Sequence, residues 1–143
     1  MNDPAISIKD YLLAQGFGPF AGSSAFSLYI GHPPDKPDAL ILINATGGMS
    51  PHPRLLLNYP SVQVMVRGAP SGYVAATTKM KEVVAALLGM DTVVLNGDTY
   101  RGSHQIGDVS YLGQDDNTRS MHSANFRFDV EPAAVAGGHR VSI

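Results

Sequence analysis

The chain has 143 residues, 44% of them hydrophobic, which suits one domain that folds around its own core. It contains no cysteine, so a disulfide framework and a thiolate metal site are both excluded. The formal net charge of −2 offers no basic surface for nucleic acid, and the longest apolar stretches, 39–43 and 83–90, are far shorter than the roughly 20 residues of a membrane span, so we expect no membrane partner.

Two segments have the sequence features of helices. The first is predicted over 8–15, with Ser7 as its N-cap and Gly16 at its C-terminal cap. The second and longer helix is predicted over 71–88, with Ser71 as its N-cap and Gly89 at its end. Apolar residues at helical spacing mark the face that we expect to be buried: Tyr73, Ala76, Met80, Val83, Val84 and Leu87.

Alternating or continuous apolar runs predict the strands. These are 26–30, 40–43, 62–67, 93–95, 106–112 and 124–130. The run 40–43 is apolar throughout, as in a strand that is covered on both faces. Three prolines make 32–37 a rigid loop, and 46–53 is predicted to be a second, looser loop. Asn96-Gly97 indicates a tight turn between strands.

The order of these elements predicts an α+β fold, with one mixed, mostly antiparallel sheet packed by two helices. Neither an internal repeat nor a domain boundary interrupts the pattern, so we expect a single domain over 1–132. Small residues and glycines follow Pro132, and they predict a flexible C-terminal tail over 133–143.

No group of residues in the sequence predicts catalysis, a cofactor or a metal site. The five histidines do not have metal-binding spacing, and the segment 68–72 lacks the spacing of a nucleophile elbow. Asp115 and Asp116 could act as an acid–base pair or as calcium ligands. We favour a solvated turn, because the residues that follow do not continue a calcium-loop pattern.

Several segments, in their order along the chain, resemble the phage minor capsid and tail-terminator family. The segments that carry the resemblance are Gly31–Asp38, Ala45–Gly48, Pro60–Gly68, the long helix, Tyr111–Arg119 and Ser123–Phe128. The resemblance extends over about 6–130. Family members often have an acidic residue and a tyrosine at the start of the long helix, where this chain has Ser71-Gly72-Tyr73.

The resemblance implies a structural virion protein with neither enzymatic activity nor a cofactor. Such proteins form a ring, usually of six subunits, on the last ring of the major tail tube protein. The ring stops tube growth and gives the head-completion or connector protein its docking surface. The expected location is the tail–neck junction of the virion, after assembly in the host cytoplasm. The alternatives are another neck, head-completion or minor capsid protein, and a small hydrolase or binding module with a concave pocket.

Charged residues at strand ends and in turns are the candidates for subunit contacts. On its own strand, Arg67 could equally be an exposed charge or a partnered one. We predict that Arg67, Asp115, Asp116 and Arg119 act at subunit contacts or hold the loops that make them.

A second set of candidates comes from an acid-rich region, because 89–129 contains six Asp against three Arg. We predict that Asp91, Asp98 and Asp108 line the channel of the ring, with Asp98 projecting from a hairpin tip. DNA would then pass without specific binding, because carboxylates repel its phosphates.

Overall fold

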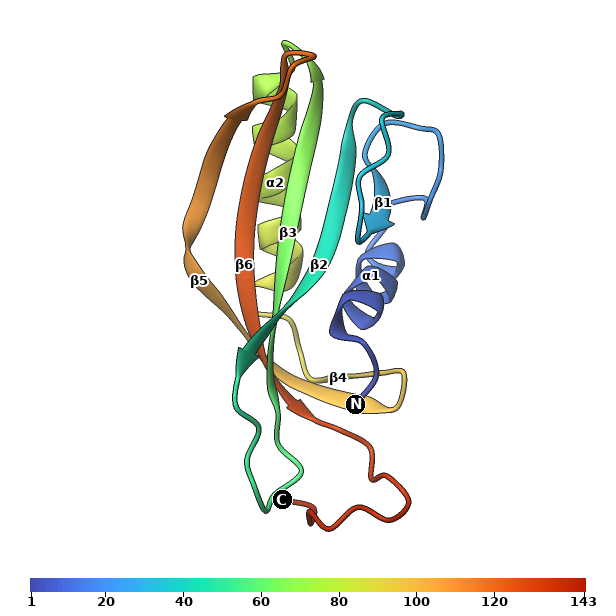
Figure 1. The fold of residues 1–143 in the computed structure, drawn as a ribbon, viewed down its shortest axis with the longest axis vertical. Coiled ribbons are helices and arrows are strands. Elements are labelled where there is room, and N and C mark those ends of the chain that lie inside the picture. The colour runs from blue at the N-terminus through green and yellow to red at the C-terminus, as the bar shows by residue number, and fades with distance from the viewer.

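A computed structural model describes residues 1–143 as two helices and one six-stranded sheet (Figure 1). In chain order the elements are α1 (Pro4–Ala14), β1 (Ser27–Ile30), β2 (Leu40–Met49), β3 (Tyr59–Pro70), α2 (Tyr73–Leu87), β4 (Val93–Leu95), β5 (Asp98–Gln114) and β6 (Arg119–Glu131). The predicted α+β fold is confirmed. No helix here has the length and apolar character that a membrane crossing requires.

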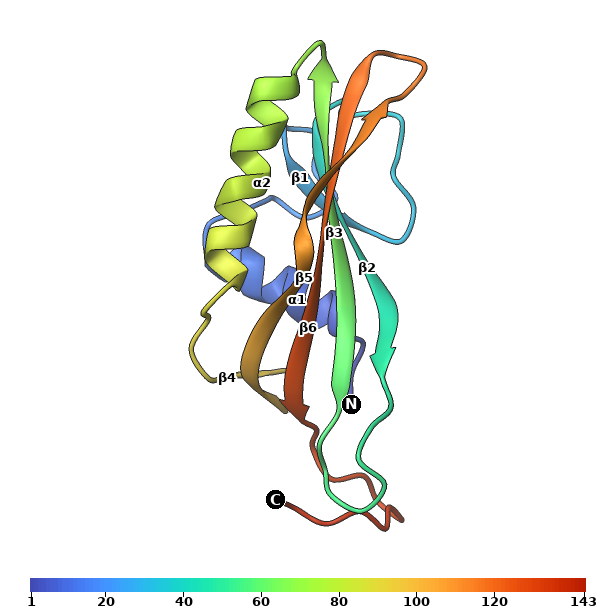
Figure 2. The ribbon, with the colours of Figure 1, turned by 90° about the vertical axis from the view of Figure 1, so that its left-hand side faces the viewer.

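The strands lie in the order β1-β2-β3-β6-β5-β4. Only β1 and β2 are parallel, and every other neighbouring pair is antiparallel, so the sheet is mixed and mostly antiparallel as predicted. A parallel pair cannot be joined by a tight hairpin, so the chain must return from Ile30 to Leu40 outside the sheet. That return is the proline-rich segment 31–39, which lies on the face of the sheet opposite α2 (Figure 2).

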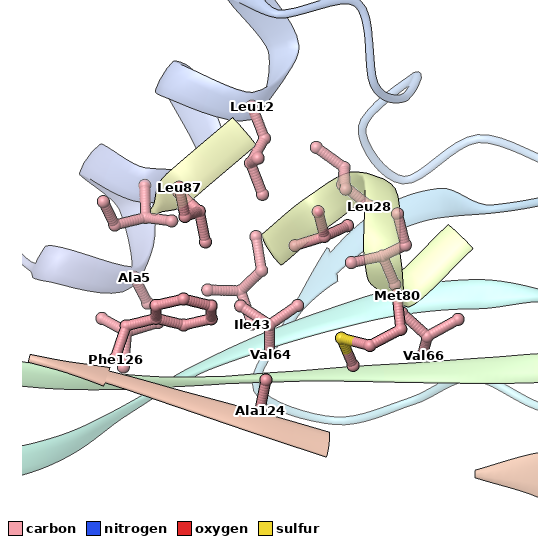
Figure 3. Packing of buried hydrophobic residues seen from close by; sticks show 14 of the residues in the cluster. Ala5, Leu12, Leu28, Ile43, Val64, Val66, Met80, Leu87, Ala124 and Phe126 are labelled. Atoms are coloured by element: carbon pink, nitrogen blue, oxygen red, sulfur yellow. The ribbon is translucent and has the colours of Figure 1, made fainter. Parts of the chain in front are cut away.

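The hydrophobic core lies between the two helices and the other face of the sheet (Figures 2 and 3). Alternate residues of β3 and β6 point into it, which is the period-2 pattern that predicted these strands. From α2 the core receives Ala76, Met80, Val83 and Leu87, all fully buried, so the predicted face of the long helix is largely confirmed.

The starts of both helices differ from the predictions. α1 begins four residues earlier than predicted, because the Asp3 carboxylate caps it by accepting from the Ala5 amide at 2.8 Å. Ser7 is therefore a buried residue inside the helix. α2 begins at Tyr73, since Ser71 has a left-handed backbone with a φ of 58° and cannot act as its cap. Tyr73 is exposed rather than buried, and its ring contacts the rings of Tyr111 and His122.

β2, β3, β5 and β6 are all longer than predicted, and in β2 and β5 the extension passes through irregularities next to glycines. β2 continues through a register shift between Ala45 and Gly47, so the first part of the predicted loop 46–53 is strand. β5 extends over 98–114, with an irregularity between Ile106 and Ser110. The Asn96-Gly97 turn is confirmed, since both of its residues have positive φ between β4 and β5.

The segment 133–143 returns along the loop that joins β2 to β3. The Arg140 guanidinium donates to Oδ1 of Asn58 at 2.7 Å, and the Val141 amide donates to the Arg54 carbonyl at 2.8 Å. Together the segment and this loop form the lower end of the molecule in Figure 1.

Burial of Met80 gives a direct test of the core. We expect Met80→Asp to lower the free energy of unfolding by about 3 kcal/mol or more, because it places a charge without a partner in the core. Val74→Asp is the control on the same helix, since Val74 is 76% exposed, and it should change stability by less than about 0.5 kcal/mol. Urea denaturation of both variants measures the difference, and equal stabilities would contradict this packing of α2.

Candidate functional site

The site is built around Arg67, which lies in β3 and whose side chain is on the sheet face opposite the helices. Its Nε donates to the carbonyl of Asp38 at 2.8 Å. Its Nη2 donates to the carbonyls of Pro34, Asp35 and Pro37 at 2.7, 3.2 and 2.9 Å. Arg67 is only 4% exposed and holds the backbone of the 31–39 loop. Of the two alternatives, an exposed charge and a partnered charge, it is the second.

A second arginine, Arg119 at the start of β6, holds the same loop. Its Nη1 donates to the Asp35 carbonyl at 2.7 Å and to Oδ1 of Asp38 at 3.2 Å. Its Nε donates to Oδ2 of Asp115 at 2.7 Å, within the turn between β5 and β6. The Asp115 carboxylate also accepts from the backbone amides of Asn117 and Arg119. Arg119 therefore ties the β5–β6 turn to the 31–39 loop.

The loop covers apolar residues of β2. Leu40 is paired in register with Arg67 and so lies on the same face of the sheet, while Ile41 and Ile43 point into the core. Leu40 and Leu42 are nevertheless buried, at 0% and 5% exposed. The prediction that 40–43 is covered on both faces is thus confirmed. Leu40 and Leu42 are buried on the face of the sheet where the 31–39 loop lies (Figure 2).

The surroundings of the two carboxylates in the cluster, Asp115 and Asp38, favour their ionised state. Burial alone would raise the pKa of Asp115, but hydrogen bonds from the amide and guanidinium of Arg119 outweigh burial and leave that pKa below its ordinary 3.8. The pKa of Asp38 is lowered by its hydrogen bond from Lys36 and, to a smaller extent, by Arg119. Burial and the nearby positive charge of Arg119 lower the pKa of Arg67.

The other predicted site residues are not part of this cluster. Asp116 is exposed and makes no side-chain hydrogen bond or ion pair. Asp91 and Asp108 are exposed, and Asp108 accepts from the next amide in the chain, that of Val109. The structure therefore brings together Arg67, Asp115 and Arg119 and leaves the rest apart.

The expectation that Asp98 projects from a hairpin tip is wrong. Asp98 does follow the Asn96-Gly97 turn, but it is only 1% exposed. Its carboxylate accepts from the amides of Asn2 and Ala133, at 2.8 and 2.9 Å. Because segments from both ends of the chain close over it, Asp98 joins them to the hairpin and cannot present a free charge to a channel.

Sequence reasoning missed the residues that Arg67 and Arg119 hold. The two arginines donate mainly to backbone carbonyls of the 31–39 loop. Every residue type has such a carbonyl, so the sequence does not reveal which ones accept these hydrogen bonds. The prolines predicted a rigid loop, yet nothing in the local pattern predicted where it would pack. Asp35 and Asp38 were the only visible signal, as acidic residues in a segment rich in proline.

The cluster has the chemistry of a structural clamp. All its charged groups are engaged in hydrogen bonds that fix one loop and one turn. Nowhere in the chain do three or more His, Cys, Asp or Glu side chains lie close enough to hold a metal ion.

Removal of Arg67 should destabilise the folded chain. We expect Arg67→Ala to lower the free energy of unfolding by about 3 kcal/mol, because it removes a buried guanidinium that donates to four carbonyls of the loop. Arg67→Lys should recover little of this, since one ammonium lacks the planar fork that reaches four carbonyls. Arg101→Ala is the control, because Arg101 has a half-exposed side chain, paired with Glu131, and should contribute less than about 1 kcal/mol. Urea denaturation compares the three variants, and an Arg67→Ala variant as stable as the control would disprove the clamp.

The lowered pKa of Asp115 gives a prediction about pH. A carboxyl whose pKa is lowered by folding stabilises the protein above its unfolded pKa, and this stabilisation is lost as the pH falls through the folded pKa. Between roughly pH 5 and pH 2, the stability difference between the parent chain and Asp115→Asn should therefore shrink. Denaturation at a series of pH values measures that difference. A difference that stays constant over the whole range would show that the carboxylate is not stabilised by folding.

Comparison with known proteins provides evidence independent of this geometry. A family model described as bacteriophage tail terminator protein matches residues 11–132, which is most of the chain. No curated protein matches the chain. The matched range contains the 31–39 loop and both arginines that hold it.

Proposed function

Since the chain belongs to the bacteriophage tail terminator family, and so has a structural role in a phage tail, we propose that it caps the tail tube as a ring of six subunits. The ring stops further addition of the major tail tube protein and forms the surface to which the head-completion or connector protein binds. It is a component of the virion, and its proposed position there is the tail–neck junction. We propose that the ring assembles in the host cytoplasm. The observation that carries this proposal is the family match over 11–132.

The geometry of the clamp supports this proposal. Subunits of a ring meet through two different surfaces, and each surface loses conformational freedom when it is buried. A loop that is already held by Arg67 and Arg119 has little freedom left to lose. The 31–39 loop and the β5–β6 turn are therefore suited to subunit contacts as a single preorganised surface.

The shape of the chain suits a protein that joins two different partners. The β5–β6 turn lies at one end of the long axis, and the β2–β3 loop with the segment 133–143 lies at the other end (Figures 1 and 2). We assign one end to the tube and the other to the connector. Because the two ends differ in sequence and structure, a ring built from them binds a different partner on each side.

The DNA channel of such a ring needs a lining that does not bind phosphate. With Asp98 buried, the exposed carboxylates of Asp91 and Asp108 remain the candidates. Their negative charge would keep the duplex from adhering to the wall.

The proposal is tested by growth of tail tubes. Purified tube protein should polymerise to shorter, uniform tubes when this chain is added, because a capped end accepts no further subunits. Electron microscopy of stained samples measures the tube lengths and should show the chain at one end only, with sixfold averages in end-on views. Tubes of unchanged length with bare ends would refute the capping function.

A further inference from the structure

One edge of the sheet is open over most of its length. β4 covers only the first three residues of β5, from Asp98 to Tyr100. Beyond Tyr100 no strand lies outside β5, which continues to Gln114. A long strand edge with free backbone groups is a template for pairing with another chain, and proteins that keep one usually cover it.

An apolar groove of about 320 Å³ runs beside this edge, between β5 and α2. Its apolar lining consists of Met80, Val84, Ala85, Leu88 and Val109. Lys81 and Asp108 also line it, so the groove carries one positive and one negative charge. Leu88 is 44% exposed, so part of this apolar lining faces solvent.

The opposite edge of the sheet is closed, but it presents an aromatic ring. The Leu28 amide donates to the Pro19 carbonyl and the Ala21 amide donates to the Leu28 carbonyl, both at 2.8 Å, so 19–21 closes the outer edge of β1. Phe20, between them, makes no backbone hydrogen bond of its own and is 44% exposed. Nζ of Lys9 lies 4.7 Å from the centre of its ring and also pairs with Asp10.

We propose that the groove between α2 and β5 of one subunit receives the Phe20 segment of the next copy of this chain. This inference rests on the proposed ring and names one pair of surfaces for its subunit contacts, in addition to the surface formed by the 31–39 loop and the β5–β6 turn. A ring needs head-to-tail contacts between different surfaces, and these two lie on opposite lateral sides of the sheet (Figure 1).

The chemistry of the two surfaces is complementary. An exposed aromatic ring meets an apolar hollow, and burying both removes apolar surface from water. The free backbone groups of Phe20 meet the open edge of β5. The groove carries Lys81, while the Phe20 side carries the partly exposed carboxylate of Asp10, so charges of opposite sign can approach each other across the contact.

The absence of cysteine from the chain makes this contact open to crosslinking. The double variant Ala21→Cys with Ala85→Cys places one thiol on each surface and leaves the Phe20 ring in place, and both positions are exposed, so the fold should be kept. A short bismaleimide should link neighbours into a ladder of dimer to hexamer on a denaturing gel, with the chain assembled on tail tubes. A mixture of the two single variants should give dimers and no ladder.

The control replaces the groove position by another alanine of the same helix. Ala75 is exposed but does not line the groove, so Ala21→Cys with Ala75→Cys should give no ladder. Ala85→Glu should abolish rings on tubes while leaving the unfolding midpoint of the monomer unchanged, and Ala75→Glu should leave both intact. Rings that form on tubes without the Ala21–Ala85 crosslink would overturn this contact and leave the capping function standing. A chain that forms no ring on tubes would overturn both.

Discussion

Two guanidinium groups hold the 31–39 loop against one face of the sheet by donating to its backbone carbonyls. Three of the residues in 31–39 are prolines, which have no amide to donate, and the carbonyls of four of its residues point toward Arg67. Arg67 reaches them from β3, near the middle of the sheet, and Arg119 reaches Asp35 and Asp38 from β6. Leu40 and Leu42 are buried on the face of the sheet where this loop lies, and Arg119 joins the β5–β6 turn to the same loop through Asp115.

The clamp also makes the two sides of the sheet different. Helices cover one face, while a loop held by charge covers part of the other (Figure 2). The two lateral edges differ as well, since 19–21 closes the outer edge of β1 while β5 is open beside an apolar groove. A subunit with this asymmetry has two distinct surfaces to offer, which a closed ring requires and a two-fold dimer does not. The structural role given by the family and the geometry of the chain are thus compatible.

Local periodicity was enough to predict the sheet strands and the buried stripe of α2, because both depend on neighbours in the sequence. Arg67 lies on the face of β3 opposite the core, in agreement with the alternation along 62–67. The alternation could not show that a loop some 30 residues earlier in the chain covers that face, because the contacts are long-range bonds to backbone carbonyls. The error over Asp98 has a similar origin: the turn was predicted correctly, but Asn2 and Ala133 close over the carboxylate from both ends of the chain.

The central claim is that this chain forms the last ring of a tail tube. Electron cryomicroscopy of complete virions tests it most directly, because side chains at the tail–neck junction identify the protein that lies there. We expect sixfold density between tube and connector into which 1–143 fits, with the 31–39 loop held against β3 and β6 in every subunit. A different protein at that position, with this chain located in the capsid or distal tail, would contradict the claim.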